Sequence, residues 1–421
     1  MVQDFFAALA SESLVGRDGA VAGGLAEKLP AFFRQQGRRP CSDAEVPATA
    51  RAVDPVRTSG VCGARVERDI ALNCSPLQVL VDTEPRVVGE VRGRRKAPLH
   101  AGTWWQYPDG SGVLEDCWSR SQPGASGSGN NWAMGYHQQG AAMREAVLEL
   151  VRAEAERSDR MAAFQIVHSL AGGTGSGLGS RVSDELREAY PQCFQLHAVV
   201  WPYSSGEVVL QNYNAVLSLA RLADCSDAII NLRNEEAHDI CTTMLDIPRP
   251  GMPDLNRVLA GSLAALFLPA GEHPRWGAPA GAPASLAVAD IAQCLCASPA
   301  HKMLSLRTIP QVSERARAFS ADRWHALAKH LAQMLAADHH MQEGIDWAAA
   351  PGAQNRSLAN LLTLRGPGWD EVDLAAFQDP RHFAPWSASL FARGSSTPLA
   401  AADKSIQLLS NSQAPVKLLD R

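Results

Sequence analysis

The sequence lacks the features that define several common protein classes. No apolar stretch reaches the roughly 18 residues that a helix needs to cross a bilayer, and no basic region precedes an apolar core at the N-terminus. We therefore expect neither a membrane span nor a signal peptide. No Cys-x-x-Cys pair occurs and the nine cysteines are an odd number, which disfavours metal sites and a disulfide framework. The formal net charge of −5 gives no electrostatic reason to expect nucleic acid.

What is present is the composition of an ordinary globular protein. The 421 residues are 46% hydrophobic and 20% charged, which predicts two or three domains with apolar cores. Cysteines without a pairing pattern fit best with buried, reduced thiols in a cytosolic protein. We accordingly expect a cytoplasmic location.

A glycine-dense segment at residues 171–179 follows an apolar run (164–170) and precedes a helical pattern (181–190). A turn of this kind between a strand and a helix is typical of a phosphate-binding loop, because glycines expose backbone N–H groups and the helix N-terminus attracts anions. The segment reads Ala171, Gly172, Gly173, Thr174, Gly175, Ser176, Gly177, Leu178 and Gly179, in which Thr174 and Ser176 add hydroxyl donors. A flexible glycine–serine linker is disfavoured, because linkers rarely join a buried strand to a helix without polar flanks.

Two commoner nucleotide-binding loops are excluded by the spacing. Gly172 and Gly177 have the spacing of a P-loop, but Leu178 stands where the lysine must be. The Gly-x-Gly-x-x-Gly count of a dinucleotide fingerprint also fails, because its last position falls on Leu178 or Ser180. The loop is therefore of a different nucleotide-binding type.

Acidic residues end a predicted strand at residues 77–82. Asp82 and Glu84 follow it, where α/β folds bind ligands, and a carboxylate beside phosphates needs a cation between them. Magnesium takes oxygen ligands and keeps several waters, so both residues are candidate outer-sphere ligands. On spacing alone, a helix N-cap followed by a first-turn Glu is the better interpretation.

A second glycine-rich segment covers residues 122–137. We expect Gly127, Gly129 and Asn130 to offer donors to a terminal phosphate and Trp132 to anchor the segment to the core. A helix is predicted after it, at about 140–156, with one apolar face.

Alternating strands and helices over residues 77–231 predict an α/β fold with a mostly parallel, Rossmann-like sheet covered by helices on both faces. The expected strands include 164–170, 195–201 and 227–231, and the expected helices include 211–222 and 233–245. A long, buried helix is expected at 253–268. A Pro/Gly/Ala linker at 270–285 separates these from an α+β region with strands at 303–309, 358–364 and 405–410 and helices at 286–295 and 323–336. We divide the chain into a nucleotide-binding α/β domain (1–252, with an irregular insert at about 16–75), a long central helix (253–269) and a second, α+β domain (286–421).

With these pieces assembled, the chain resembles the tubulin superfamily, and within it the delta branch. The segment Gly-Gly-Thr-Gly-Ser-Gly (172–177) is the most specific match, and Trp-Pro-Tyr (201–203) and Glu-Gly-Ile-Asp (343–346) favour the delta branch. Further matches lie at 80–85, 127–133, 206–209, 211–214, 254–256, 302–305 and 410–413.

The resemblance implies a GTP-binding structural protein of the cytoskeleton, at centrioles, basal bodies and cilia, with other tubulins or centriolar proteins as partners. GTP, bound with Mg²⁺, would act as an assembly or conformational switch. In this comparison residues 171–177 wrap the phosphates, Gly129 and Asn130 sense the γ-phosphate, and Asp82 and Glu84 act near Mg²⁺. The nucleoside contacts it implies are Glu207 to the ribose and Asn234 and Asn256 to the guanine edge.

The resemblance also implies a GTPase site completed by an acidic residue of a neighbouring subunit, a position that falls on Asp290. A solvated helix Asp is nearly as good an interpretation, and Ala287 occupies a second, normally acidic position. Whether GTP is hydrolysed is left open.

The chain departs from the family pattern in three ways, and the first two favour an alternative, a degenerate tubulin-fold scaffold with weak or no nucleotide binding. The match begins at the helix after the first strand and first phosphate loop, the aromatic that stacks on guanine is replaced by Met252, and the last match precedes two C-terminal helices. A nucleotide-dependent enzyme of another class, such as a dehydrogenase, is disfavoured by the failed glycine count.

Overall fold

An eight-stranded mixed sheet, in the order β3-β4-β5-β7-β10-β8-β9-β6, organises the molecule. The computed structural model describes residues 33–35, 74–76, 81, 127–156, 161, 163–206, 208–268, 270–272, 288–317, 323–345, 355–387, 389–399 and 402–420. The strands of the sheet are β3 (Ala163–Ser169), β4 (Phe194–Trp201), β5 (Ala228–Arg233), β6 (Gly271–Glu272), β7 (Met303–Ile309), β8 (Ser357–Arg365), β9 (Ser389–Ser395) and β10 (Ser405–Ser412). The expected α/β fold is confirmed.

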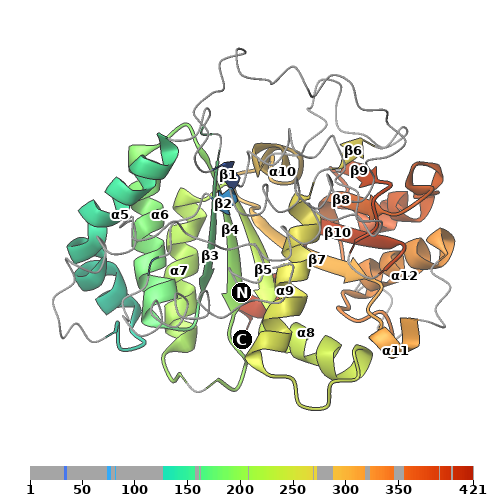
Figure 1. The fold of residues 1–421 in the computed structure, drawn as a ribbon, viewed down its shortest axis with the longest axis horizontal. Coiled ribbons are helices and arrows are strands. Elements are labelled where there is room, and N and C mark those ends of the chain that lie inside the picture. The colour runs from blue at the N-terminus through green and yellow to red at the C-terminus, as the bar shows by residue number, and fades with distance from the viewer. Residues whose placement is uncertain are drawn as a thin grey trace, which may run out of the picture.

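The first half of the sheet is parallel and carries helices on both faces (Figure 1). Alternate residues of β4 explain this: Leu196 and Ala198 pack toward the long helix α9 (Met252–Phe267) and α10 (Val288–Leu295), whereas Val199 packs toward α7 (Gln211–Cys225). Strands buried on both faces are typical of parallel sheets. Because β3, β4 and β5 are parallel neighbours, their C-terminal ends lie at the same edge of the sheet.

Helix α9 is the buried helix that the sequence predicts. Leu255, Leu259, Leu263 and Leu266 are at most 7% exposed. The helix begins where the Asp254 carboxylate accepts a hydrogen bond from the Gly251 N–H at 3.0 Å, a capping arrangement that satisfies a free N-terminal donor. Full burial of a leucine side chain contributes about 1.5–3 kcal/mol to stability.

The last turn of α9 is held by two buried arginines of the second half of the sheet. Arg365 of β8 donates to the carbonyls of Ala265 (3.0 Å) and Leu268 (2.7 Å), and Arg393 of β9 donates to the carbonyl of Leu266. Cations at a helix C-terminus satisfy its unpaired carbonyls and its negative dipole end. Helix α9 is thereby fixed to strands β8 and β9.

The second half of the sheet is mixed. Strand β10 pairs antiparallel with both β7 and β8, and β8 pairs parallel with β9. Helix α12 (Trp324–Ala337) covers it through Leu327, Leu331 and Leu335. In the part of the chain that the structure describes, no helix is long and apolar enough to cross a membrane.

Three details differ from the sequence expectations. Residues 33–35 and 74–76, inside the supposed irregular insert, form the paired strands β1 (Phe33–Gln35) and β2 (Cys74–Pro76). Strands β6 and β9 were not predicted, and β6 begins within the expected linker at 270–285. The helix expected from residue 181 begins earlier, because η4 (Thr174–Leu178) runs directly into α6 (Gly179–Ala189). The predicted strand at 77–82 lies outside the described residues, apart from residue 81.

Candidate functional site

Three turns converge at the carboxyl edge of the parallel strands. The glycine segment follows β3, a polar turn at 202–206 follows β4, and Asn234 follows β5. Because β3, β4 and β5 are parallel neighbours, their ends lie side by side. This is the edge where open α/β sheets bind ligands. The structure thus brings the predicted phosphate loop and one predicted base contact to the same edge.

The glycine segment is ordered and half helical. The Ala171 N–H donates to Ser169 Oγ at 3.2 Å, and the Ser176 N–H donates to the Gly172 carbonyl at 3.1 Å. Within the described residues, the N–H groups of Gly172 and Gly173 donate no hydrogen bond. Two open donors just ahead of a helix N-terminus are suited to an anion.

The second glycine-rich segment packs backbone to backbone against the first. A Cβ on Gly173 would lie 2.6 Å from Ser128 Cβ and 2.7 Å from Asn131 N, too close for any side chain. Gly129 and Asn130 adopt positive φ angles of 55° and 52°, the left-handed region that favours glycine and asparagine. Both predicted γ-phosphate residues therefore lie in a tight turn against the phosphate loop.

Trp132 anchors this turn, as the sequence analysis expects. Its side chain is 6% exposed and stacks on Tyr136 with ring centroids 4.6 Å apart. Its indole N–H donates to Ser180 Oγ at 3.4 Å, and the Tyr136 hydroxyl donates to Asp184 at 2.6 Å. Both contacts reach α6, so the helix that follows the first loop also holds the second.

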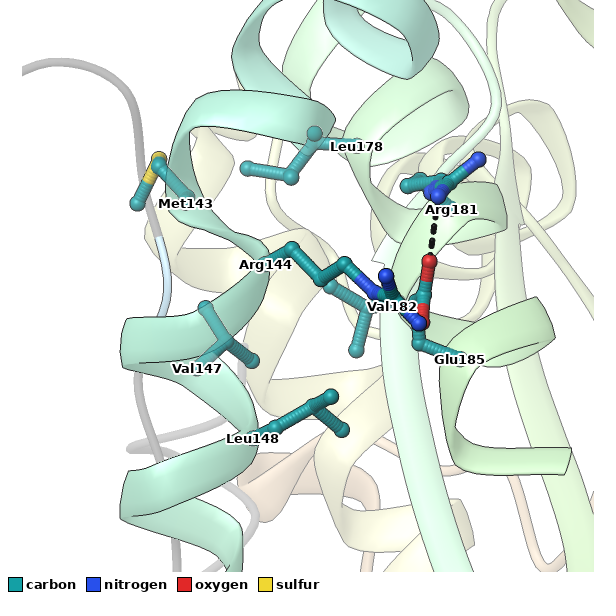
Figure 2. A pocket seen from close by; sticks show the side chains of 9 residues that line it. Met143, Arg144, Val147, Leu148, Leu178, Arg181, Val182 and Glu185 are labelled. Atoms are coloured by element: carbon teal, nitrogen blue, oxygen red, sulfur yellow. Dashed lines mark hydrogen bonds and ion pairs between the residues drawn. The ribbon is translucent and has the colours of Figure 1, made fainter. Parts of the chain in front are cut away.

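A shallow pocket lies between α5 (Gly140–Ala155) and α6, and Figure 2 shows the side chains that line it. Its lining is largely aliphatic. The Glu185 carboxylate is bound there by Arg144, at 2.5 Å, and by Arg181. We interpret it as a packing feature that joins the two helices following the two loops.

The predicted base contacts lie on α8 (Asn234–Asp239) and α9, which pack against each other. Asn234 Oδ1 is buried, and the described part of the chain offers it no hydrogen-bond partner. Asn234 is the first residue of α8, and its side-chain oxygen caps no backbone N–H of that helix. Asn256, on the first turns of α9, also forms no side-chain hydrogen bond with the described residues. Met252, at the expected stacking position, is 54% exposed.

Several predicted site residues cannot be placed with these. Asp82, Glu84 and Glu207 lie outside the described residues, although the turn before Glu207 is fixed by Ser204 N–H donating to Glu235 at 2.6 Å. Asp290 lies in α10, and its side chain is outside the described part. Among the described residues no group of three or more His, Cys, Asp or Glu could hold a metal ion.

One residue with a direct role in the geometry was not singled out from the sequence. Asn214, on α7, is 2% exposed and hydrogen-bonds to both glycine-rich segments. The sequence carries only a weak signal for this buried polar face: the polar residues at 211, 214 and 218 are spaced so that they share one face of a helix.

Parallel strands with glycine loops at their carboxyl edge, followed by a buried central helix, define the class of this protein. The family model described as "Tubulin/FtsZ family, GTPase domain" matches residues 71–242, and the chain belongs to the tubulin family.

Individual relatives agree with this. The chain is 35% identical to the Tubulin delta chain of Macaca fascicularis over 366 residues, which cover 81% of this chain and 76% of that one. The Tubulin delta chain of Mus musculus is 36% identical over the same length. The Tubulin beta chain of Porphyra purpurea is 36% identical over 192 residues, 45% of this chain and 38% of that one. The predicted resemblance to tubulins of the delta branch is confirmed.

Proposed function

We propose that the chain binds GTP at the carboxyl edge of β3, β4 and β5, and that GTP acts as the switch of a tubulin-type structural protein of centrioles, basal bodies and cilia. The observation that supports this best is Asn234 Oδ1, a buried acceptor with no partner among the described residues. A buried unsatisfied acceptor costs about 1–3 kcal/mol. A ligand that donates to it would remove that cost.

The chemistry of the base end favours guanine. Guanine presents two donors on one edge, the N1–H and the exocyclic amine, whereas adenine has no N1–H. Asn234 Oδ1 would accept from this edge, and Asn256 would supply the second amide from α9. An amide pair of this kind rejects a base that cannot complete its hydrogen bonds.

The phosphate end is supported by the open N–H groups of Gly172 and Gly173. Ala171, Thr174, Gly175, Ser176 and Gly177 would complete the phosphate loop, and Gly129 and Asn130 would contact the terminal phosphate. Mg²⁺ takes oxygen ligands and would neutralise the phosphates when bound. Asp82 and Glu84 would hold it through water, and Glu207 would bind the ribose.

We further propose that contact with another tubulin subunit occurs on the outer face of α7. Tyr213 and Val216 are 71% and 64% exposed, and Val209, just before the helix, is 92% exposed. Exposed apolar residues gathered beside a binding site mark an interaction surface. An acidic residue of the complex would then position water for GTP hydrolysis, with Asp290 supplying this group to a neighbour. Mixing the chain with purified αβ-tubulin and GTP should give a complex in sedimentation; its absence at micromolar concentrations counts against this contact.

Titration of the 421-residue chain with GTP, ATP and NAD(P) tests the central proposal. Tight, Mg²⁺-dependent binding of GTP in preference to ATP is the expected result. No measurable GTP binding would instead support the degenerate scaffold, which the exposed Met252 favours, because a thioether is a weaker platform for a base than an aromatic ring. Preferential NAD(P) binding would contradict both the GTP-binding protein and the degenerate scaffold, and would indicate a dehydrogenase.

A further inference from the structure

The buried polar face of α7 joins the two glycine-rich segments through one side chain. Asn214 Nδ2 donates to the Asn130 carbonyl and to the Ala171 carbonyl, each at 2.8 Å. Asn214 Oδ1 accepts from the Trp132 N–H at 3.0 Å. An asparagine amide has two donor hydrogens and one carbonyl oxygen. Every donor and the acceptor are thus used, and all three partners are backbone groups of the two segments.

The bond to Ala171 also sets where a neighbouring donor points. The Ala171 carbonyl and the Gly172 N–H belong to one planar peptide unit and point in opposite directions. Holding the carbonyl on Asn214 therefore aims the Gly172 N–H away from α7. That N–H is one of the two open donors of the phosphate loop.

We propose that Asn214 is a positioning residue that fixes the Asn130 turn and the Ala171–Gly172 peptide relative to each other, so that both contact one terminal phosphate. This inference rests on the proposed GTP binding. Only GTP has a γ-phosphate to meet the Asn130 turn, so the residue sets the preference for GTP over GDP.

Neither aspartate nor alanine at this position keeps all three hydrogen bonds. Aspartate retains the acceptor for Trp132 but loses both donors and places a charge against two carbonyl oxygens. Alanine leaves all three groups unpaired. One turn further along α7, the Ser218 hydroxyl donates to the Asn214 carbonyl at 2.7 Å and lies 3.2 Å from the Ser176 carbonyl, but it forms no hydrogen bond with the Ala171–Gly172 peptide.

The test compares Asn214→Ala and Asn214→Asp with Asn212→Ala in the 421-residue chain. Asn212 is an exposed asparagine on the same helix and serves as the matched control. Affinities for GTP and GDP with Mg²⁺ are measured by calorimetry, and urea denaturation followed by circular dichroism establishes that each variant is folded. The near-isosteric Asn214→Asp variant keeps the test available should Asn214→Ala not fold.

We expect the GTP/GDP affinity ratio to fall by about tenfold in both Asn214 variants, the equivalent of one to two lost hydrogen bonds, and to stay unchanged in Asn212→Ala. An unchanged GTP/GDP affinity ratio would overturn the inference. If both affinities fell equally, the role of Asn214 would be purely structural. Absence of GTP binding by the unaltered chain would refute the proposed function instead, so the two failures are distinguishable.

Discussion

Gly173→Ala should destabilise the protein, although its backbone conformation accepts alanine. Gly173 has φ −70° and ψ −36°, ordinary right-handed values, so alanine here would normally stabilise by about 0.4–1 kcal/mol through the unfolded state. The new Cβ, however, would lie 2.6–2.7 Å from Ser128 and Asn131, whereas ordinary van der Waals contact begins at 3.4 Å. The two segments must therefore separate by roughly 0.7 Å, and overpacking of this kind costs about 1–3 kcal/mol.

The net effect should be a loss of about 1–2 kcal/mol in the free energy of unfolding. Gly261→Ala is the matched control, because Gly261 lies inside α9 with nothing within 4 Å of its Cβ position. Helix propensity predicts that this control gains about 0.5–1 kcal/mol. Urea denaturation of the three proteins, followed by circular dichroism, measures both changes. A Gly173→Ala protein as stable as the unaltered chain would refute the close packing of the two segments.

Three further predictions concern the base, the pH and the partner. Asn256→Ala should weaken GTP binding by about 1–3 kcal/mol, because the guanine edge is left unpaired; an unchanged GTP/ATP preference in calorimetry would contradict this. Burial lowers the pKa of His168 to about 4, so its neutral form is favoured in the fold. The free energy of unfolding is therefore highest above pH 6.5 and falls as the pH drops toward 4, by up to about 3 kcal/mol from His168. His168→Gln should remove part of this slope from urea-denaturation profiles, because burial also lowers the pKa of the neighbouring His197; an equally steep profile would exclude His168 as a cause. Val216→Asp, at a site 64% exposed, should leave stability within about 0.5 kcal/mol but weaken sedimentation with αβ-tubulin; equal sedimentation would remove α7 from the interface.

The strands and the central helix could be predicted because local pattern and tertiary structure agree there. The run at 303–309 is the same in sequence and structure, and α9 carries leucines at helical spacing between a capped start and an apolar end. Burial on both faces then leaves little choice of conformation.

Other features depend on contacts that the sequence does not reveal. Thr174–Leu178 reads as a loop because glycine is a poor helix former, yet it is helical, since it stacks on α6 and packs against the second segment. Strand β9 contains Arg393 and Gly394 and shows no clear alternation; it is set by pairing with β8. The sequence alone does not distinguish Asn214 from Asn212; packing buries Asn214 and leaves Asn212 exposed.

The arginines at the end of α9 have a mechanical consequence. The helix is roughly 24 Å long at 1.5 Å per residue, with Asn256 near one end and the Arg365 and Arg393 contacts at the other. Sliding the helix along its axis by even an ångström would strip buried guanidinium groups of their carbonyl partners. We therefore expect β8 and β9 to move together with the helix, so that an axial displacement at the Asn256 end would also displace these two strands.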